Sequence, residues 1–116
     1  TATGATTRTS LGSGATDSAS GLPWADLAEL PAQARETIVL IQRGGPYPYP
    51  KDGATFGNRE GLLPAKSRGH YREYTVPTPG SDDRGARRIV TGERDTVFYY
   101  TDDHYRSFRQ IEVPRP

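Results

Sequence analysis

Apolar side chains recur along this chain with two different periods, and the first of them predicts a helix. Ala34, Ile38 and Ile41 follow the spacing i, i+4, i+7, which places them on one face of a helix. Pro31 precedes this stretch and Gly44-Gly45-Pro46 follows it. Proline is tolerated in the first turn of a helix and glycine commonly follows the last, so the helix is predicted to lie between them.

From Tyr71 onward the apolar positions alternate with period two, which is typical of half-buried strands. Strands are predicted over residues 71–76, 87–91, 97–101 and 108–113, the last of them short and at an edge of the sheet. The connections are short and rich in turn residues, which favours antiparallel neighbours. The predicted fold class is therefore α+β, with an N-terminal helix packed on one face of an antiparallel β-sheet.

Alternation within a strand also predicts which side chains share a face. If Val76 and Ile89 face the helix, then Glu73 and Arg88 face away from it. We therefore expect Val76, Ile89 and Phe98 in the core, with an acid and a guanidinium group together on the opposite, exposed face.

The start of the chain has a different composition from the rest. Residues 1–21 are almost entirely Thr, Ala, Ser and Gly, with Arg8 and Asp17 as the only charges. Such a segment buries too little apolar surface to offset the entropy lost on ordering, so it is predicted to be a disordered tail or linker. Residues 22–116 are predicted to form one domain, as the total length of 116 residues allows.

Composition excludes several classes of function. The net charge of +1 is too small for a protein that coats nucleic acid by charge alone, so any basic site must be local. The absence of Cys excludes thiolate chemistry, and two His are too few for a His-rich metal centre. No apolar run is long enough to span a membrane. We expect no metal, no cofactor and no membrane, and a secreted chain whose leader has been removed.

Four polar residues supply the groups that metal-free RNA cleavage needs. The carboxylate of Glu73 can accept a proton from a ribose 2′-hydroxyl, and the imidazole of His104 can donate one to the leaving oxygen. The guanidinium groups of Arg84 and Arg88 can hold the phosphate and stabilise the charge that grows on it.

Residues 56–60, with the sequence Phe-Gly-Asn-Arg-Glu, can recognise one base. Guanine presents N1–H and N2–H₂ as donors, which the carboxylate of Glu60 can accept together while backbone N–H groups reach O6. Adenine lacks the N1 proton and would leave the carboxylate unpaired. Gly57 is expected to let the loop turn its amides inward, and Phe56 can stack on the base.

Each of these features has an ordinary structural interpretation when taken alone. Glu73 could be a solvated strand carboxylate, and Arg87-Arg88 a salt-bridged strand face. Asp102-Asp103-His104 could be a surface turn, and His70, which has no partner motif, is expected at the surface. Their joint order along the chain is what favours catalysis.

That order resembles the small secreted bacterial guanyl-preferring ribonucleases, the group of barnase and the streptomycete ribonuclease Sa, over roughly residues 22–113. The resemblance implies the microbial ribonuclease fold. It also implies cleavage of single-stranded RNA after guanosine, first by transesterification to a 2′,3′-cyclic phosphate and then by slower hydrolysis. The matching segments are residues 56–61, 63–64, 66–67, 72–73, 84, 87–89 and 101–108.

Roles carry over from the resemblance position by position. In the family pattern one carboxylate is the general base, one imidazole the general acid, two arginines bind the phosphate, a tyrosine lines the phosphate pocket and a loop reads the base. The matching residues are Glu73, His104, Arg84 with Arg88, Tyr105, and the loop residues Phe56, Gly57, Asn58, Arg59 and Glu60.

The resemblance has one structural departure and leaves alternatives open. Streptomycete members carry a disulfide joining the chain ends, which is absent here and would contribute about 2–4 kcal/mol. The resemblance also implies an acidic, barstar-like protein inhibitor, and we expect a monomer. The same domain could instead be the C-terminal toxin of a larger secreted protein, or an RNA-binding module without catalysis; the presence of both Glu73 and His104 argues against the latter.

Overall fold

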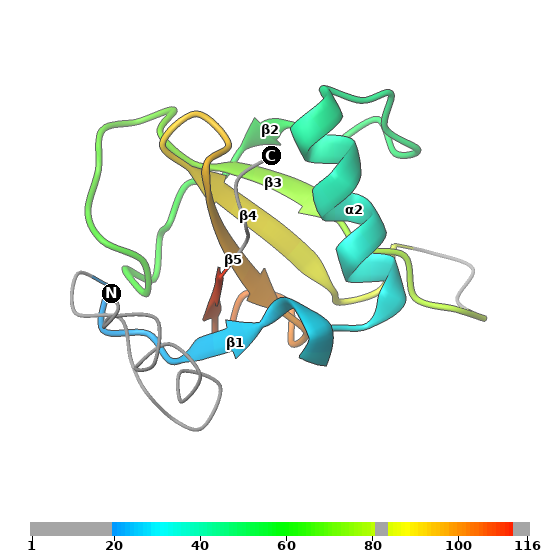
Figure 1. Cartoon of the computed structure of the whole chain (residues 1–116). Helices are drawn as coiled ribbons and strands as arrows, with labels where there is room; N and C mark the ends of the chain where they lie inside the picture. The colour runs from blue at the N-terminus through cyan, green and yellow to red at the C-terminus, as the bar shows by residue number, and fades with distance from the viewer. Residues whose placement is uncertain (1–19, 81–83, 113–116) are drawn as a thin grey trace, which may run out of the picture.

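The structure is a computed structural model that describes residues 20–80 and 84–112. The prediction of a disordered segment over residues 1–21 falls almost wholly outside these residues. A 3₁₀ helix, η1 (Leu27–Glu29), and one α-helix, α2 (Ala32–Arg43), accompany a six-stranded sheet. Figure 1 shows α2 lying across one face of that sheet. The strands are β1 (Trp24–Asp26), β2 (Ala54–Thr55), β3 (Arg72–Thr75), β4 (Arg88–Gly92), β5 (Val97–Thr101) and β6 (Arg109–Glu112), in the order β1-β6-β5-β4-β3-β2.

The predicted helix is confirmed, together with its signals for start and end. The carbonyl of Pro31 accepts the first bonds of α2, and Gly44 follows the helix in the left-handed conformation, with φ 83°. Glycine adopts this conformation without the steric cost that a Cβ would bring. Ala34, Ile38 and Ile41 are all buried, as their spacing predicted.

The main core lies between α2 and the sheet. Val76 and Ile89 are fully buried and Phe98 is 3% exposed, so the prediction of this face from strand alternation is confirmed. The remaining members come from the helix, the first strand, the segment between these two, and alternate positions of the later strands: Ala25, Leu30, Ala34, Ile38, Ile41, Tyr74, Tyr100 and Ile111.

The predicted strands are present, but the edge of the sheet was wrongly placed. Residues 24–26 form β1, which pairs in parallel with β6, so β6 is an inner strand and the sheet is not purely antiparallel. The edges are β1 and the two-residue β2, which pairs with β3. Both edge strands are too short to show an alternating pattern, which explains why the sequence did not reveal them.

The face of the sheet away from α2 has an apolar cluster of its own. The sequence predicted polar side chains on this face, and the structure shows that the prediction was incomplete. The buried members are Leu63, Tyr71, Val90, Tyr99 and Phe108, with Leu22, Phe56, Val97 and Tyr105 packed around them. The long connection between β2 and β3, at the left of Figure 1, supplies Phe56 and Leu63 to this cluster.

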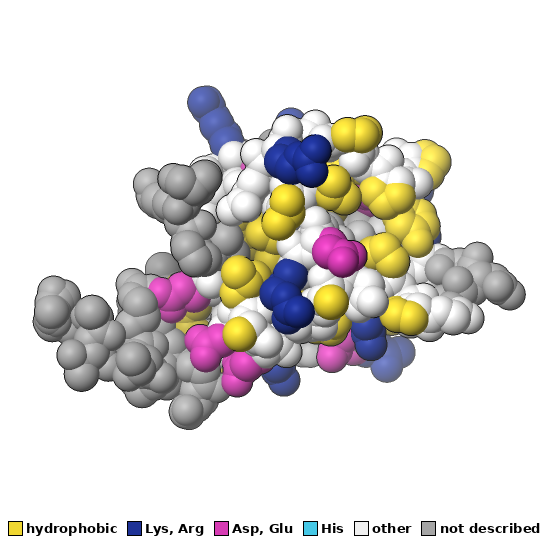
Figure 2. Space-filling model, turned by 45° about the vertical axis from the view of Figure 1, so that its right-hand side comes forward, with side chains coloured by type: hydrophobic (Ala, Val, Ile, Leu, Met, Phe, Trp, Pro, Cys, Tyr) yellow, Lys and Arg dark blue, Asp and Glu magenta, His cyan; other side chains and the backbone are white. Residues whose placement is uncertain are grey.

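The surface carries no large region of one charge on the side shown in Figure 2, where basic, acidic and hydrophobic side chains are interspersed. This agrees with the small net charge of the chain. Among the described residues, no helix is both long enough and apolar enough to cross a membrane.

Candidate active site

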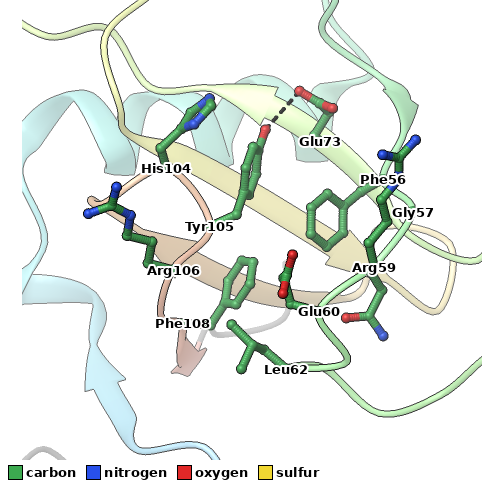
Figure 3. A pocket seen from close by; sticks show the side chains of 11 residues that line it. Phe56, Gly57, Arg59, Glu60, Leu62, Glu73, His104, Tyr105, Arg106 and Phe108 are labelled. Atoms are coloured by element: carbon green, nitrogen blue, oxygen red, sulfur yellow. Dashed lines mark hydrogen bonds between the residues drawn. The ribbon is translucent and has the colours of Figure 1, made fainter.

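One pocket on the face away from α2 brings most of the predicted site residues together. It has a volume of about 610 Å³ and is drawn in Figure 3. Glu73 and His104 lie on either side of the Tyr105 hydroxyl group at one end, and Glu60 lies at the other. The lining residues are Phe56, Gly57, Asn58, Arg59, Glu60, Leu62, Glu73, His104, Tyr105, Arg106 and Phe108.

Glu73 lies on β3 and faces away from α2, as the alternation predicted. The Tyr105 hydroxyl donates to its Oε1 at 2.9 Å, and Arg84 Nη2 donates to the same oxygen at 3.3 Å. Both donors use Oε1, so Oε2 has no hydrogen-bond partner within residues 20–80 and 84–112. One oxygen of the carboxylate is therefore held in place while the other remains able to accept a proton.

Arg84 and Arg88 are not among the residues that line the pocket, although Arg84 contacts Glu73, which is. Arg84 Nε donates to Thr75 Oγ1 at 2.9 Å, which fixes the guanidinium beside Glu73. Arg88 is only 3% exposed, so its predicted place on an exposed face is wrong. It lies on β4, between β3 and β5, and its Nη1 donates to the carbonyls of Gly85 and Arg87.

The burial of Arg88 has an electrostatic consequence. Its Nε is buried and has no hydrogen-bond partner, and no carboxylate of the described residues forms an ion pair with it. A buried cation without a counter-charge is costly, and an anion close to it removes part of that cost. The arginine pair therefore favours a negatively charged ligand at this end of the pocket.

Tyr105 contacts both Glu73 and the aromatic side chains that line the pocket. Its ring packs against Phe56, with ring centroids 4.9 Å apart. Burial raises the pKa of the Tyr105 hydroxyl, and so do the hydrogen bond to Glu73 and the charge of that residue, while Arg88 acts in the opposite direction. The phenol therefore stays protonated at neutral pH and acts as a hydrogen-bond donor.

His104 is exposed and belongs to a short loop after β5 with an unusual backbone. Its ring centroid lies 5.0 Å from that of Tyr105. His104 and Tyr105 have φ angles of 57° and 73°, in the left-handed region that non-glycine residues rarely adopt. The amide of His104 donates to the carbonyl of Ala86 at 3.0 Å, which ties the loop to the segment before β4. Such backbone conformations persist only where surrounding contacts impose them, and they cluster at functional sites.

Asp103 supplies those contacts, and it was not among the site residues predicted from the sequence. Its Oδ1 accepts hydrogen bonds from Thr101 Oγ1 at 2.7 Å and from the amides of Arg106 and Ser107, at 3.1 and 3.0 Å. The Ser107 hydroxyl donates to its Oδ2 at 2.5 Å. The bond from Ser107 is the main cause that lowers the pKa of Asp103 to about 2, so the carboxylate is ionised at neutral pH. An Asp just before a turn that bonds to following amides is a common local signal, and it could have identified this role.

The predicted recognition loop, residues 56–60, is held by the side chain of Asn58. Asn58 Nδ2 donates to the carbonyl of Leu63 at 3.0 Å, and its Oδ1 accepts from the amide of Leu63 at 3.1 Å. Both polar atoms of the Asn58 side chain are therefore hydrogen-bonded to the backbone of Leu63. The left-handed positions are Asn58, with φ 53°, and Gly61, with φ 69°, and Gly57 is not among them. The conformational reason expected for Gly57 is therefore wrong.

Glu60 and Phe56 face the interior of the pocket. Figure 3 shows the carboxylate of Glu60 between the rings of Phe56 and Phe108, with Leu62 beside it. Glu60 is exposed, and its carboxylate makes no hydrogen bond or ion pair with another described residue. Arg59, also exposed, continues the loop at the rim.

Leu62, Arg106 and Phe108 complete the lining and were not among the predicted site residues. Leu62 is 38% exposed, and an exposed leucine two residues after the proposed base-reading acid is a weak signal of a binding surface. Phe108 was expected only as a strand residue, because its place in the pocket depends on the loop from residue 102 to 107.

His70, the second histidine, lies outside the pocket. It is partly buried, and its Nε2 lies 3.1 Å from Glu93 Oε2, so its expected place as a simple surface residue is only partly right. Within the described residues, no group of three or more His, Cys, Asp or Glu side chains could hold a metal ion. The chemistry that these residues offer is an acid–base pair beside an anion-binding arginine pair.

Known proteins that resemble this chain agree with the chemistry of the site. A family model described as ribonuclease matches residues 13–112. The guanyl-specific ribonuclease Sa3 of Kitasatospora aureofaciens is 61% identical over 83 residues, which cover 72% of this chain and 59% of that protein. The guanyl-specific ribonuclease St of Saccharopolyspora erythraea is 58% identical over 90 residues, covering 78% of this chain and 88% of that protein.

Solved structures agree with these relatives. A structure of ribonuclease Sa2 in complexes with mononucleotides superposes with a TM-score of 0.77 at 49% identity, covering 79% of this chain and 95% of that one. A structure of ribonuclease Sa2 with guanosine-2′-cyclophosphate superposes with a TM-score of 0.75 at 48% identity, covering 82% and 99% of the two chains.

Proposed function

Because the chain belongs to the ribonuclease family, we propose that it is a metal-independent endoribonuclease that cleaves single-stranded RNA after guanosine. The observation that carries the proposal is the single pocket in which Glu73 and His104 flank Tyr105 while Glu60 lies at the other end. A relative with 48% identity was solved with a guanosine cyclophosphate, which supports both the base and the reaction type.

Guanine is proposed to bind between the recognition loop and the aromatic side chains. The carboxylate of Glu60 accepts hydrogen bonds from N1–H and N2–H₂, and backbone amides of residues 57–59 reach O6. Phe56, whose ring lies beside that of Tyr105, offers a stacking surface. The side chain of Asn58 contributes by holding the loop in shape, since its amide is already bonded to Leu63.

In the first step Glu73 acts as general base and His104 as general acid. Oε2 of Glu73 takes the proton from the 2′-hydroxyl, and the 2′-oxygen forms a bond to phosphorus. The bond from phosphorus to the 5′-oxygen of the next nucleotide breaks, and that oxygen receives a proton from His104. The products are a 2′,3′-cyclic phosphate and a free 5′-hydroxyl. Each proton transfer typically contributes 10²–10⁴-fold to the rate.

Arg84 and Arg88 act on the charge of the transition state. Negative charge grows on the nonbridging phosphate oxygens as the 2′-oxygen attacks, and fixed cations near those oxygens gain in strength as it does. Arg84 is fixed by Thr75 and Glu73, and Arg88 by backbone carbonyls, so neither has to reorganise during the reaction. The protonated hydroxyl of Tyr105 donates to the same oxygen of Glu73 as Arg84 does, and it helps to orient that carboxylate.

Hydrolysis of the cyclic phosphate uses the same groups in exchanged roles. His104, now neutral, takes a proton from water, and the water oxygen bonds to phosphorus. The bond to the 2′-oxygen breaks, and this oxygen takes back the proton from Glu73. The product ends in a 3′-phosphate, and both side chains return to their starting states.

The experiment is a product analysis with metal removed. A short single-stranded RNA with one guanosine is incubated with the protein in EDTA, and the ends of the fragments are mapped. We expect cleavage after the guanosine, with 2′,3′-cyclic phosphate ends early and 3′-phosphate ends later. Loss of cleavage in EDTA, or ends that carry a 5′-phosphate, would refute the mechanism.

An acidic protein inhibitor and an extracellular site of action are proposed together with this activity. A cell that makes such an enzyme needs protection until export, and the arginine cluster at the pocket would attract an acidic partner. We expect ribonuclease activity in the culture medium, an enzyme that is monomeric in solution, and an acidic protein in the lysate that forms a complex with the His104→Ala variant. Activity confined to the lysate, or a lysate without such a protein, would contradict this pair of proposals.

A further inference from the structure

Two further open depressions adjoin the pocket through shared lining residues, and we call the two together the basic groove. Its first part, of about 660 Å³, shares the loop residues 56–59 with the pocket. Its second part, of about 630 Å³, shares residues 67–69 with the first and ends at the turn between β4 and β5. Figure 1 shows that the connection between β2 and β3 and the turn between β4 and β5 lie at the same end of the sheet.

This groove is lined by basic side chains that have no other function in the fold. They are exposed, and within residues 20–80 and 84–112 none of their charged groups makes an ion pair or a hydrogen bond. Cations that are not engaged in the protein are free to bind an anionic ligand without breaking existing contacts. These side chains are Arg59, Lys66 and Arg68 in the first part, and Arg72 and Arg94, with Arg68 again, in the second.

The acidic residues beside the groove are already engaged. No Asp or Glu lines the first part. In the second part, Glu93 pairs with His70 at 3.1 Å, and Asp95 Oδ1 accepts hydrogen bonds from the hydroxyl groups of Tyr74 and Thr91. These two carboxylates keep their negative charge, but five basic side chains line the groove, so its basic character is only partly offset, although the chain as a whole is close to neutral.

We propose that this basic groove binds the phosphates of the RNA strand on the 5′ side of the cleaved guanosine. The inference rests on the proposed function, which fixes the direction of the strand. The scissile phosphate then lies between Glu73 and His104, and the following nucleotide lies beyond His104, near Arg106. The groove starts on the opposite side of the guanine, so the RNA that precedes the guanosine is the part that follows it.

Contacts of this kind have a measurable signature, because they release counterions from the nucleic acid. The binding constant for single-stranded nucleic acid falls with salt with a logarithmic slope of about 0.7 per neutralised phosphate. For two to three contacts, the benefit of the groove should fall roughly tenfold between about 50 and 200 mM salt.

The experiment compares a guanosine-containing dinucleotide with two longer RNAs. One carries about four uridines on the 5′ side of the guanosine and the other carries them on the 3′ side. We expect the 5′ extension to raise kcat/KM by about tenfold at low salt, in line with a few phosphate contacts, and to lose that advantage as salt rises.

Two double variants separate the groove from general charge effects. Lys66→Gln with Arg68→Gln is expected to remove most of the advantage of the 5′ extension while cleavage of the dinucleotide stays unchanged. Arg43→Gln with Lys51→Gln removes the same charge from the far end of α2 and the loop that follows, and it should keep the advantage. All of these side chains are exposed, so both variants should unfold at the temperature of the parent protein.

The outcomes are distinguishable. An equal advantage of the 5′ extension in the groove variant, an advantage of the 3′ extension only, or no effect of either extension would overturn the inference. If the groove binds an acidic protein instead of RNA, neither extension should change kcat/KM. If the parent protein does not cleave the dinucleotide, the proposed function fails instead. Binding of 5′-extended oligonucleotides with 2′-deoxyguanosine, which lack the attacking hydroxyl, then still tests the groove, and loss of binding in the Lys66/Arg68 variant would support it.

Discussion

Replacement of His104 by alanine is expected to lower kcat/KM for cleavage after guanosine by about 10²–10⁴-fold. The side chain is exposed and makes no hydrogen bond to a described residue, so the substitution removes the proton donor and leaves the fold intact. The remaining activity would come from Glu73 and from the arginine pair. The measurement is the initial rate on a guanosine-containing dinucleotide, together with the thermal unfolding temperature.

A substrate with a better leaving group tests the role of His104 directly. If the 5′-oxygen is replaced by sulfur, the leaving thiolate, with a pKa near 8.5, departs without needing a proton. His104→Ala should then cleave this substrate at nearly the rate of the parent protein, whereas Glu73→Gln should stay impaired. Equal losses of His104→Ala on both substrates would show that the imidazole does not act as the general acid.

The second histidine provides the matched control. His70 pairs with Glu93 and lies outside the pocket, so His70→Ala should leave the dinucleotide rate unchanged. The dinucleotide is the appropriate substrate for this control, because it does not reach the basic groove beside His70.

Regular elements were predictable wherever they are long enough to show a period. The stripe of Ala34, Ile38 and Ile41 defined α2, and the alternation around Val76 and Ile89 placed Glu73 on the face away from the helix. The strands β1 and β2 were missed because they have three and two residues, and β1 pairs with a strand from the other end of the chain.

Most of the predicted site residues line one pocket in the structure, but their geometry did not follow from the sequence. Arg88 was correctly assigned to the face away from α2, but alternation carries no information on depth, and the side chain is almost fully buried there. The backbone of His104 is fixed by Ala86 and Asp103, which are tertiary and turn contacts that periodicity does not report. Local bonding by Asp and Asn side chains is the feature that would have improved the prediction, at Asn58 as well as at Asp103.

The carboxylates at the two ends of the pocket differ in how firmly other side chains hold them. Glu73 is bonded to Tyr105 and Arg84, so its position relative to the phosphate is set before the substrate arrives. Glu60 makes no such bonds to described residues and is exposed. Its hydrogen-bonding capacity is therefore left for the base, and the loop that carries it is held instead through Asn58.

Glu60→Gln is expected to reduce the preference for guanosine over adenosine by about 10–100-fold. The neutral amide presents one acceptor and one donor group to an edge of guanine that has only donors, so it leaves a mismatched polar group, which costs about 1–3 kcal/mol. Most of the change should appear as slower cleavage after guanosine, because adenine gains little from either side chain. The measurement is kcat/KM for two dinucleotides that differ only in the first base.

The size and the kind of the Glu60 effect separate base recognition from catalysis. Glu36→Gln, an exposed substitution on α2, removes the same charge and should leave the ratio of the two substrates unchanged. Cleavage of a substrate without a base at the first position should be equal in Glu60→Gln and in the parent protein, since Glu73, His104 and the arginines are untouched. A preference for guanosine that survives Glu60→Gln would mean that the backbone amides of the loop discriminate alone, and the carboxylate between Phe56 and Phe108 would then need a different role.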